Sequence, residues 1–277
     1  MAPTFVVVPQ WQGSVSPRAM RLVDGAEMIR GDLPSSATAV VDVPVEAGDA
    51  IESGIHRLST LLLVRERQAA VLRGVSDWAL TIGGDCGVSL ASVEHAARQH
   101  TDDLALVWFD ARPRLHTAET SPSGGFGGMV LRAISGEGRR ELLLDAASSV
   151  PFDRIILAGT RDMDDAEAAI VNDREISVLS ANDLETPDAL LAALRQIGAS
   201  RVYLHIGLDV LDPAALTGLA DLVPFGLHVE ALTRLITAVR GEFTLAGATI
   251  AGFAPATVDA GNDDMSSILR IIGAVTR

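Results

Sequence analysis

The chain has 277 residues, and 48% of them are hydrophobic. Folding can therefore form a sizeable core and bury roughly three quarters of the surface that the extended chain exposes. Its 36 acidic and 22 basic residues give a net charge of -14, which repels nucleic-acid backbones and anionic lipid, and we expect neither nucleic acid nor membrane as a partner. All 22 basic residues are arginine, which excludes Schiff-base lysine chemistry and a phosphate-loop lysine.

Three features of the sequence bear on its location. No apolar run reaches the roughly 18 to 20 residues that a membrane-spanning helix needs. No basic segment precedes the apolar run at residues 5–8, as a secretory signal would require. The lone cysteine, Cys86, has no partner for an internal disulfide, which agrees with a reducing compartment. We therefore expect a cytoplasmic protein.

Short apolar runs rich in β-branched residues alternate with longer segments of helical periodicity. The runs predict strands at residues 5–8, 39–45, 79–82, 104–109, 154–158, 176–179, 202–208 and 249–253. The segments between them predict helices at residues 51–73, 88–100, 164–171, 187–197, 229–239 and 265–275. This alternation predicts one α/β domain, residues 1–277, whose parallel sheet is covered by helices on both faces.

Three of the predicted strand ends carry a concentration of polar side chains. In an open α/β sheet the ligand lies beyond the carboxyl ends of the strands. The sequence there reads Gly-Gly-Asp-Cys at 83–86, Asp-Ala-Arg-Pro-Arg-Leu-His at 110–116, and His-Ile-Gly-Leu-Asp-Val-Leu-Asp-Pro at 205–213. These segments predict a pocket formed by Asp85, Cys86, Asp110, Arg112, Arg114, His116, His205 and Asp209.

In this order and at these intervals, the three segments resemble the signature of the arginase, agmatinase and formimidoylglutamase family. Its motifs read Gly-Gly-Asp-His, Asp-Ala-His-x-Asp and Ser-x-Asp-x-Asp-x-x-Asp-Pro. Residues 120–129, 158–162 and 252–255 are similar to three further family motifs, so the resemblance spans about residues 79 to 255. It implies a three-layer α/β/α fold with a mainly parallel sheet of about eight strands, and a homo-oligomer, a trimer or hexamer.

The resemblance also implies a site in which two Mn²⁺ ions activate a water molecule that attacks a guanidinium carbon. Among the six ligand positions of that site, the aspartates that match are Asp110 and Asp209. The other four positions hold Cys86, Arg112, Arg114 and Gly207. We therefore expect the manganese to be lost and the cofactor to be none.

Other catalytic positions of the family also differ in this sequence. The proton-shuttling histidine falls on Gly127, and the guanidinium-binding glutamate falls on Gly252. The two substrate-binding asparagines fall on His116 and Gly125. The sequence thus predicts that ureohydrolysis is lost and that no catalytic residue remains.

A charge argument favours a site closed by ion pairs. Arginine keeps its proton near neutrality. A divalent ion about 4 Å from a guanidinium would meet a repulsion of about 8 kcal/mol at an effective dielectric constant of about 20. We expect Arg112 and Arg114 to lie at the pocket floor, directed at Asp110 and Asp209, with both carboxylates ionised. The two arginines could instead receive an anionic metabolite.

Two alternatives keep an active site in the pocket. Cys86 could be a nucleophile if a nearby arginine lowered the pKa of its thiol, although a lone cysteine can equally be a small buried apolar residue. His116 and His205 could join Cys86, Asp110 and Asp209 in a rebuilt one-metal site.

Three functional hypotheses follow from the residues and the resemblance. The first is a non-catalytic family member with a structural, regulatory or metabolite-sensing role, whose pocket binds a small molecule. The second is a hydrolase of linear amidine or guanidine C–N bonds with a rebuilt or metal-independent site. The third is an ordinary manganese ureohydrolase, which the count of matching ligands disfavours.

Overall fold

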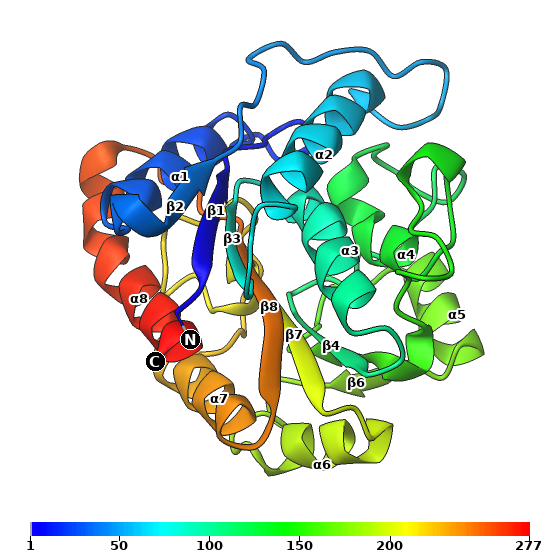
Figure 1. The fold of residues 1–277 in the computed structure, drawn as a ribbon, viewed down its shortest axis with the longest axis vertical. Helices are drawn as coiled ribbons and strands as arrows, with labels where there is room; N and C mark the ends of the chain where they lie inside the picture. The colour runs from blue at the N-terminus through cyan, green and yellow to red at the C-terminus, as the bar shows by residue number, and fades with distance from the viewer. Residues whose placement is uncertain (1) are drawn as a thin grey trace.

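One eight-stranded sheet organises the computed structural model, which describes residues 2–277 (Figure 1). The strands are β1 (Thr4–Val8), β2 (Thr38–Val40), β3 (Ala79–Gly83), β4 (Leu104–Phe109), β5 (Ile155–Ala158), β6 (Ser177–Leu179), β7 (Arg201–Gly207) and β8 (Thr244–Ala251). Their order is β2-β1-β3-β8-β7-β4-β5-β6, and every neighbouring pair is parallel.

Helices cover both faces of the sheet. They are α1 (Arg21–Gly31), α2 (Leu58–Leu72), α3 (Ser89–Gln99), α4 (Val130–Ile134), α5 (Asp165–Asp173), α6 (Asp188–Ile197), α7 (Val229–Glu242) and α8 (Val258–Thr276). Helices α1, α6, α7 and α8 contribute to the core on one face, and α2, α3, α4 and α5 to the cores on the other. The three-layer α/β/α fold expected from the resemblance is confirmed.

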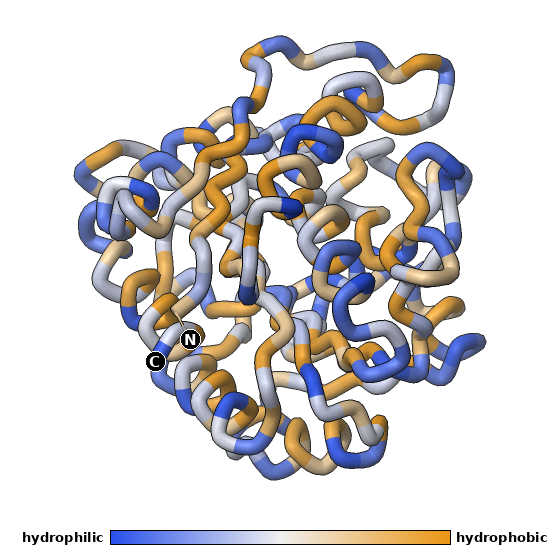
Figure 2. The backbone as a smooth tube through the Cα atoms, in the orientation of Figure 1, coloured by the Kyte–Doolittle hydropathy of each residue, from blue (hydrophilic) through white to orange (hydrophobic). Residues whose placement is uncertain are grey.

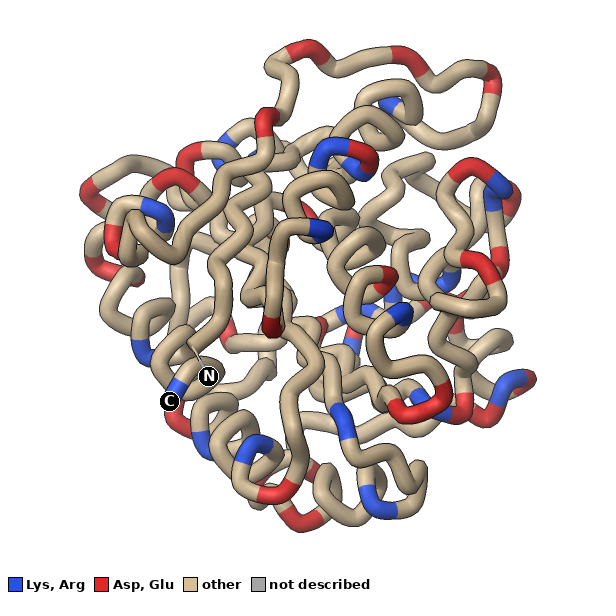
Figure 3. Tube along the Cα trace, in the orientation of Figure 1, with Lys and Arg blue, Asp and Glu red and all other residues tan. Residues whose placement is uncertain are grey.

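The central strands are apolar along their whole length because both of their faces are buried. In β4, Leu106 and Trp108 pack into the core on one face, and Val107 and Phe109 pack into the core on the other. All four side chains are fully buried. Figure 2 shows the outer helices as mixtures of hydrophilic and hydrophobic segments. In Figure 3 the charged residues lie mainly on the outer helices and loops, and most of each strand is uncharged.

Each strand expected from the sequence is present, with some bounds shifted. The strand expected at 39–45 is reduced to the three residues of β2, and β8 begins at Thr244, five residues before the expected start. Helices α1 and α4 were not predicted. Within residues 2–277, no helix combines the length and the apolar character needed to cross a bilayer.

Because all strands run in the same direction, their carboxyl ends meet at one edge of the sheet. Asp85 follows β3, Asp110 follows β4, and Asp209 lies just beyond β7. Residues separated by more than 120 positions in the sequence are thereby brought to one site, at the edge where open α/β sheets bind their ligands.

Candidate active-site pocket

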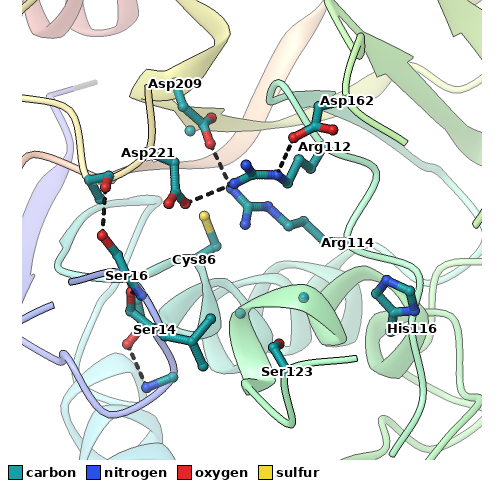
Figure 4. Close-up of a pocket in the computed structure, with 18 of the residues that line it drawn as sticks. Ser14, Ser16, Cys86, Arg112, Arg114, His116, Ser123, Asp162, Asp209 and Asp221 are labelled. Atoms are coloured by element: carbon teal, nitrogen blue, oxygen red, sulfur yellow. Dashed lines mark hydrogen bonds and ion pairs between the residues drawn. The ribbon is translucent and has the colours of Figure 1, made fainter. Parts of the chain in front are cut away.

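A cavity of about 360 Å³ lies at this edge of the sheet (Figure 4). Its lining comes from the segment after β1, from the segments after β3, β4 and β5, and from the ends of β7 and β8. Six of the eight residues that the sequence assigned to the pocket line this cavity: Asp85, Cys86, Arg112, Arg114, His116 and Asp209. The other two, Asp110 and His205, are fully buried and do not line it.

The guanidinium group of Arg114 bridges two buried carboxylates. Its Nε lies 3.0 Å from Asp110 Oδ2, and its Nη2 lies 2.7 Å from Asp209 Oδ2. The Arg114 side chain is 11% exposed, and its backbone is left-handed, with φ of 57°. A non-glycine residue in this conformation is strained, so the contacts at its far end must outweigh a local cost. The structure thus places Arg114 where the charge argument expected it.

Arg112 does not take the position that we expected from the sequence. It leaves the pocket floor and pairs with Asp162 at 2.7 Å and with Asp221 at 3.0 Å (Figure 4). Its side chain is 32% exposed. Its backbone N–H, not its guanidinium, donates to Asp110, at 2.8 Å. The expectation that both arginines reach Asp110 and Asp209 is therefore wrong for Arg112.

Because Arg112 does not reach the pocket floor, the guanidinium of Arg114 there faces two carboxylates, Asp110 and Asp209. Burial raises the pKa of Asp110, but the guanidinium charge of Arg114 outweighs this effect and holds the pKa well below its usual range. Burial and the charge on Asp110 raise the pKa of Asp209 to about 7, with Arg114 opposing them. Asp110 is therefore ionised near neutrality, and Asp209 is the more readily protonated of the two carboxyl groups. That both carboxylates stay ionised remains a prediction.

Cys86 lies next to this ion-pair cluster, with its sulfur directed toward it (Figure 4). The thiol donates to Asp110 Oδ2, with 3.5 Å between sulfur and oxygen. Burial raises the pKa of Cys86 well above its usual value, and Arg114 opposes this shift without reversing it. A thiol in this state is a poor nucleophile near neutral pH.

His205 lies in β7 and stacks on Trp108 of the neighbouring strand β4, with 3.5 Å between ring centroids. Its Nδ1 is 2.8 Å from the hydroxyl of Ser89 in α3. Its Nε2 is 3.5 Å from Asp110 Oδ2, too far for a well-formed hydrogen bond. Burial lowers the pKa of His205, so the ring is neutral and serves mainly as packing beneath the floor.

The donor atoms of Cys86, Asp110 and His205 lie within 4.8 Å of one another, as the rebuilt one-metal site would need. The same Asp110 already pairs with Arg114. His116 and Asp209 are not part of this group.

Asp85 is fixed at the other side of the floor by hydrogen bonds from three donor groups. It accepts from the side-chain amide of Gln10 and from the backbone N–H groups of Gly13 and Gly87. Burial raises its pKa to about 6 despite these bonds. Asp85 thereby ties the segment after β1 to the segment after β3.

His116 lies apart from the arginine cluster in Figure 4. It is near Asp164 and Glu167, at the start of α5, which also line the cavity. Asp164 also caps α5, because its side chain accepts from the Glu167 N–H.

Several residues that shape the site were missed from the sequence. Asp162 and Asp221, the partners of Arg112, come from two different loops. Arg161 donates to backbone carbonyl groups of six residues, Gly159, Asp209, Val210, Leu211, Val223 and Pro224, and so holds the loop that carries Asp221. The available signal was the Gly-Thr-Arg-Asp segment at 159–162, which we noted only as a match to a family motif.

The topology and the pocket together define an α/β protein with a polar centre at the carboxyl edge of a parallel sheet. The sequence model of the Arginase family matches residues 14–274. The chain belongs to the arginase family.

Individual relatives agree with this assignment. The chain is 28% identical to the arginase of Staphylococcus aureus (strain MRSA252) over 207 residues, which is 72% of this chain and 67% of that protein. It is 29% identical to the N(omega)-hydroxy-L-arginine amidinohydrolase of Streptomyces lavendulae over 217 residues, 77% of this chain and 74% of that protein. The structure of Entamoeba histolytica arginase with L-ornithine matches with a TM-score of 0.84 at 20% identity, covering 99% of this chain and 98% of that one.

Proposed function

We propose that this arginase-family protein does not hydrolyse guanidinium or amidine groups and instead uses the cavity at the carboxyl edge of its sheet to bind a small molecule. The observation that carries the proposal is the position of Arg114, whose guanidinium contacts both Asp110 and Asp209. These are the two carboxylates that match the family's manganese ligands.

The residues present do not fit a pair of Mn²⁺ ions. The six corresponding positions offer two carboxylates, one thiol, two guanidiniums and a glycine, whereas manganese prefers oxygen ligands. A guanidinium within hydrogen-bonding distance of both carboxylates competes directly with a cation for the same oxygen atoms. We therefore assign no role to manganese in this protein.

The positions that would act on a substrate support the same proposal. Gly127 and Gly252 line the cavity where the family resemblance places a proton shuttle and a guanidinium anchor. Glycine offers no side chain for acid-base transfer or for pairing with a cation. The cavity nevertheless stays open, and it is lined by charged and hydroxyl side chains that can orient a ligand, among them Ser14, Ser123 and Arg112 (Figure 4).

The metal-independent hydrolase receives less support. It needs Cys86 as a thiolate, yet the thiol is 7% exposed and its pKa is raised by burial. Its nearest hydrogen-bond partner is an acceptor, Asp110, so the proton is held on sulfur. The neutral ring of His205 contacts Ser89 and Asp110 in place of the sulfur.

The test is a turnover assay with arginine, agmatine, guanidinobutyrate and formimidoylglutamate, measuring urea, ammonia or formamide with and without saturating Mn²⁺. We expect no product above the buffer background in either condition. Product formation that disappears in Asp209→Ala would overturn the proposal, because it would show that the carboxylate still supports catalysis. Product that persists in that variant and disappears in Cys86→Ser would overturn the proposal as well, because it would show metal-independent hydrolysis by the thiol.

A further inference from the structure

A second group of polar side chains lines the same cavity, separate from the Arg114 ion pairs. His116 lies in the segment after β4, and Asp164 and Glu167 lie at the start of α5. The Nε2 atom of His116 is 3.3 Å from Asp164 Oδ2 and 3.8 Å from Glu167 Oε1. The ligand atoms of the three residues all lie within 4.8 Å of one another.

This group carries two carboxylates without an arginine to balance them. Among residues 2–277, the ion-pair contacts of Asp164 and Glu167 are both made with His116. Glu167 is 5% exposed. Asp110 and Asp209, by comparison, share the guanidinium of Arg114. A buried carboxylate is costly unless it is paired or coordinates a cation, so the wall formed by His116, Asp164 and Glu167 favours a positive charge.

The three donors are also held in place by neighbouring groups. Nδ1 of His116 is 3.4 Å from the hydroxyl of Thr120, which leaves Nε2 facing the carboxylates. Asp164 accepts the Glu167 N–H through Oδ1, which leaves Oδ2 facing His116. Glu167 Oε1 accepts the backbone N–H of Leu115 at 3.1 Å. Metal-binding histidines and carboxylates are typically oriented by such outer hydrogen bonds.

We propose that His116, Asp164 and Glu167 bind one divalent transition-metal ion, Zn²⁺ above all, with its remaining coordination positions open to the cavity. An ion about 2.1 Å from each donor requires donors about 3.0 to 3.4 Å apart. The 3.3 Å separation of His116 from Asp164 meets this requirement. The 3.8 Å separation of His116 from Glu167, and the separation of the two carboxylates, which is within 4.8 Å, need side-chain shifts to reach it.

The donor set explains the choice of metal. One imidazole suits Zn²⁺ better than Mg²⁺ or Ca²⁺, which prefer oxygen ligands alone. Two carboxylates neutralise the charge of a divalent ion. None of the three residues occupies a position that the family resemblance assigns to manganese, so this inference does not depend on the proposed loss of hydrolysis.

The test is a zinc titration of the full chain after chelator treatment, followed by calorimetry and by competition with a chromophoric chelator. We expect one equivalent of Zn²⁺ with a Kd of about 1 μM or tighter. The variants His116→Gln, Glu167→Gln and Asp164→Asn should each weaken binding at least about tenfold. Asp164→Asn is the most informative of these variants, because it should retain the fold. Asparagine caps helices as well as aspartate does, and the side chain of Asp164 is 47% exposed.

Two matched controls separate this site from unspecific binding. Asp165→Asn removes the neighbouring exposed carboxylate of α5, and His228→Gln removes an exposed histidine at the start of α7. Neither should change the zinc affinity. Zinc should raise the unfolding temperature of the unsubstituted protein and of both controls, and should raise that of Asp164→Asn clearly less.

Three results would overturn the proposal. The first is no binding at about 100 μM zinc, far above the expected Kd. The second is equal affinity of the unsubstituted protein and the Asp164→Asn variant. The third is binding that is lost in Cys86→Ser and kept in His116→Gln, which would place the ion at the cluster of Cys86, Asp110 and His205.

Discussion

Arg114→Met removes the guanidinium that Asp110 and Asp209 share and keeps a side chain of similar length. Each contact, at 3.0 and 2.7 Å, has a Coulomb energy of about 5 to 6 kcal/mol at an effective dielectric constant of about 20. Desolvation of the three groups cancels much of this energy. Removing one partner of a buried ion pair costs about 3 to 5 kcal/mol, and we expect that loss in the free energy of unfolding at pH 8.

The loss should shrink as the pH falls. Without Arg114 both buried carboxyl groups have raised pKa values, so the variant avoids the buried charge by taking up protons. Holding one carboxyl protonated costs about 5 kcal/mol at pH 8 and about 1 to 2 kcal/mol at pH 5. In the unsubstituted protein, the lowered pKa of Asp110 gives a contribution to stability that is present above pH 4. The difference between the two proteins therefore increases with pH.

The assay is urea-induced unfolding followed by tryptophan fluorescence at pH 5 and pH 8. Arg112→Met is the matched control, because its partly exposed ion pairs should contribute about 1 kcal/mol or less, with little dependence on pH. A loss in Arg114→Met no larger than in Arg112→Met, or an equal loss at both pH values, would refute the assignment of Arg114 as the counterion of a buried site.

Further expectations concern the same pocket. Cys86→Ser should cost no more than about 1 to 3 kcal/mol, and the folded protein should be alkylated slowly, whereas fast alkylation at pH 6 would indicate a thiolate. The pKa values of about 6 for Asp85 and about 7 for Asp209 lie above the unfolded value, so their contribution to stability is complete below pH 4 and is lost as the pH rises through 6 to 7. Thermal unfolding from pH 5 to 8 should therefore show decreasing stability, and an increase would contradict these shifts. Gly207→Ala should destabilise the protein by about 1 to 3 kcal/mol in the same measurement, because the added Cβ would lie 2.7 Å from Asp110 Oδ2. Unchanged stability would show that the Asp110 carboxylate moves freely.

The strands were predictable because their signal is local. A strand buried on both faces is apolar throughout, as β4 is, and its ends are marked by glycine, aspartate or proline. Helix α1 was missed because its buried stripe is narrow and includes Gly25, where a Cβ would lie 2.1 Å from the carbonyl oxygen of Phe253. That close approach is a tertiary contact, and no local periodicity reports it. Helix α4 has only five residues, too few to show a period.

The difference between local and tertiary contacts also explains why one arginine of the site was predicted correctly and the other was not. Arg114 and Asp110 are four residues apart in one loop, so their pairing could be expected from the sequence once both were placed near the pocket. The partners of Arg112 come from the loop after β5 and from the loop around Asp221, 50 and 109 residues away in the sequence. The backbone at Arg114 is also left-handed, and no sequence rule required this conformation at an arginine.

Under the proposed loss of the manganese site, the residues of the pocket are physically linked, and we expect that no single reversal would rebuild that site. Gly207 lets the carboxylates of Asp110 and Asp209 approach the same guanidinium, because a Cβ there would lie 2.7 Å from the one and 3.0 Å from the other. Restoring an aspartate at 207 would therefore push apart the pair that holds Arg114, while the positive charge would still oppose a metal. At Gly252 the φ angle is +95°, so the glutamate of the family would also need a different backbone. The ion pair and the glycines support one another, and a reversal must replace Arg114 and rebuild both loops together.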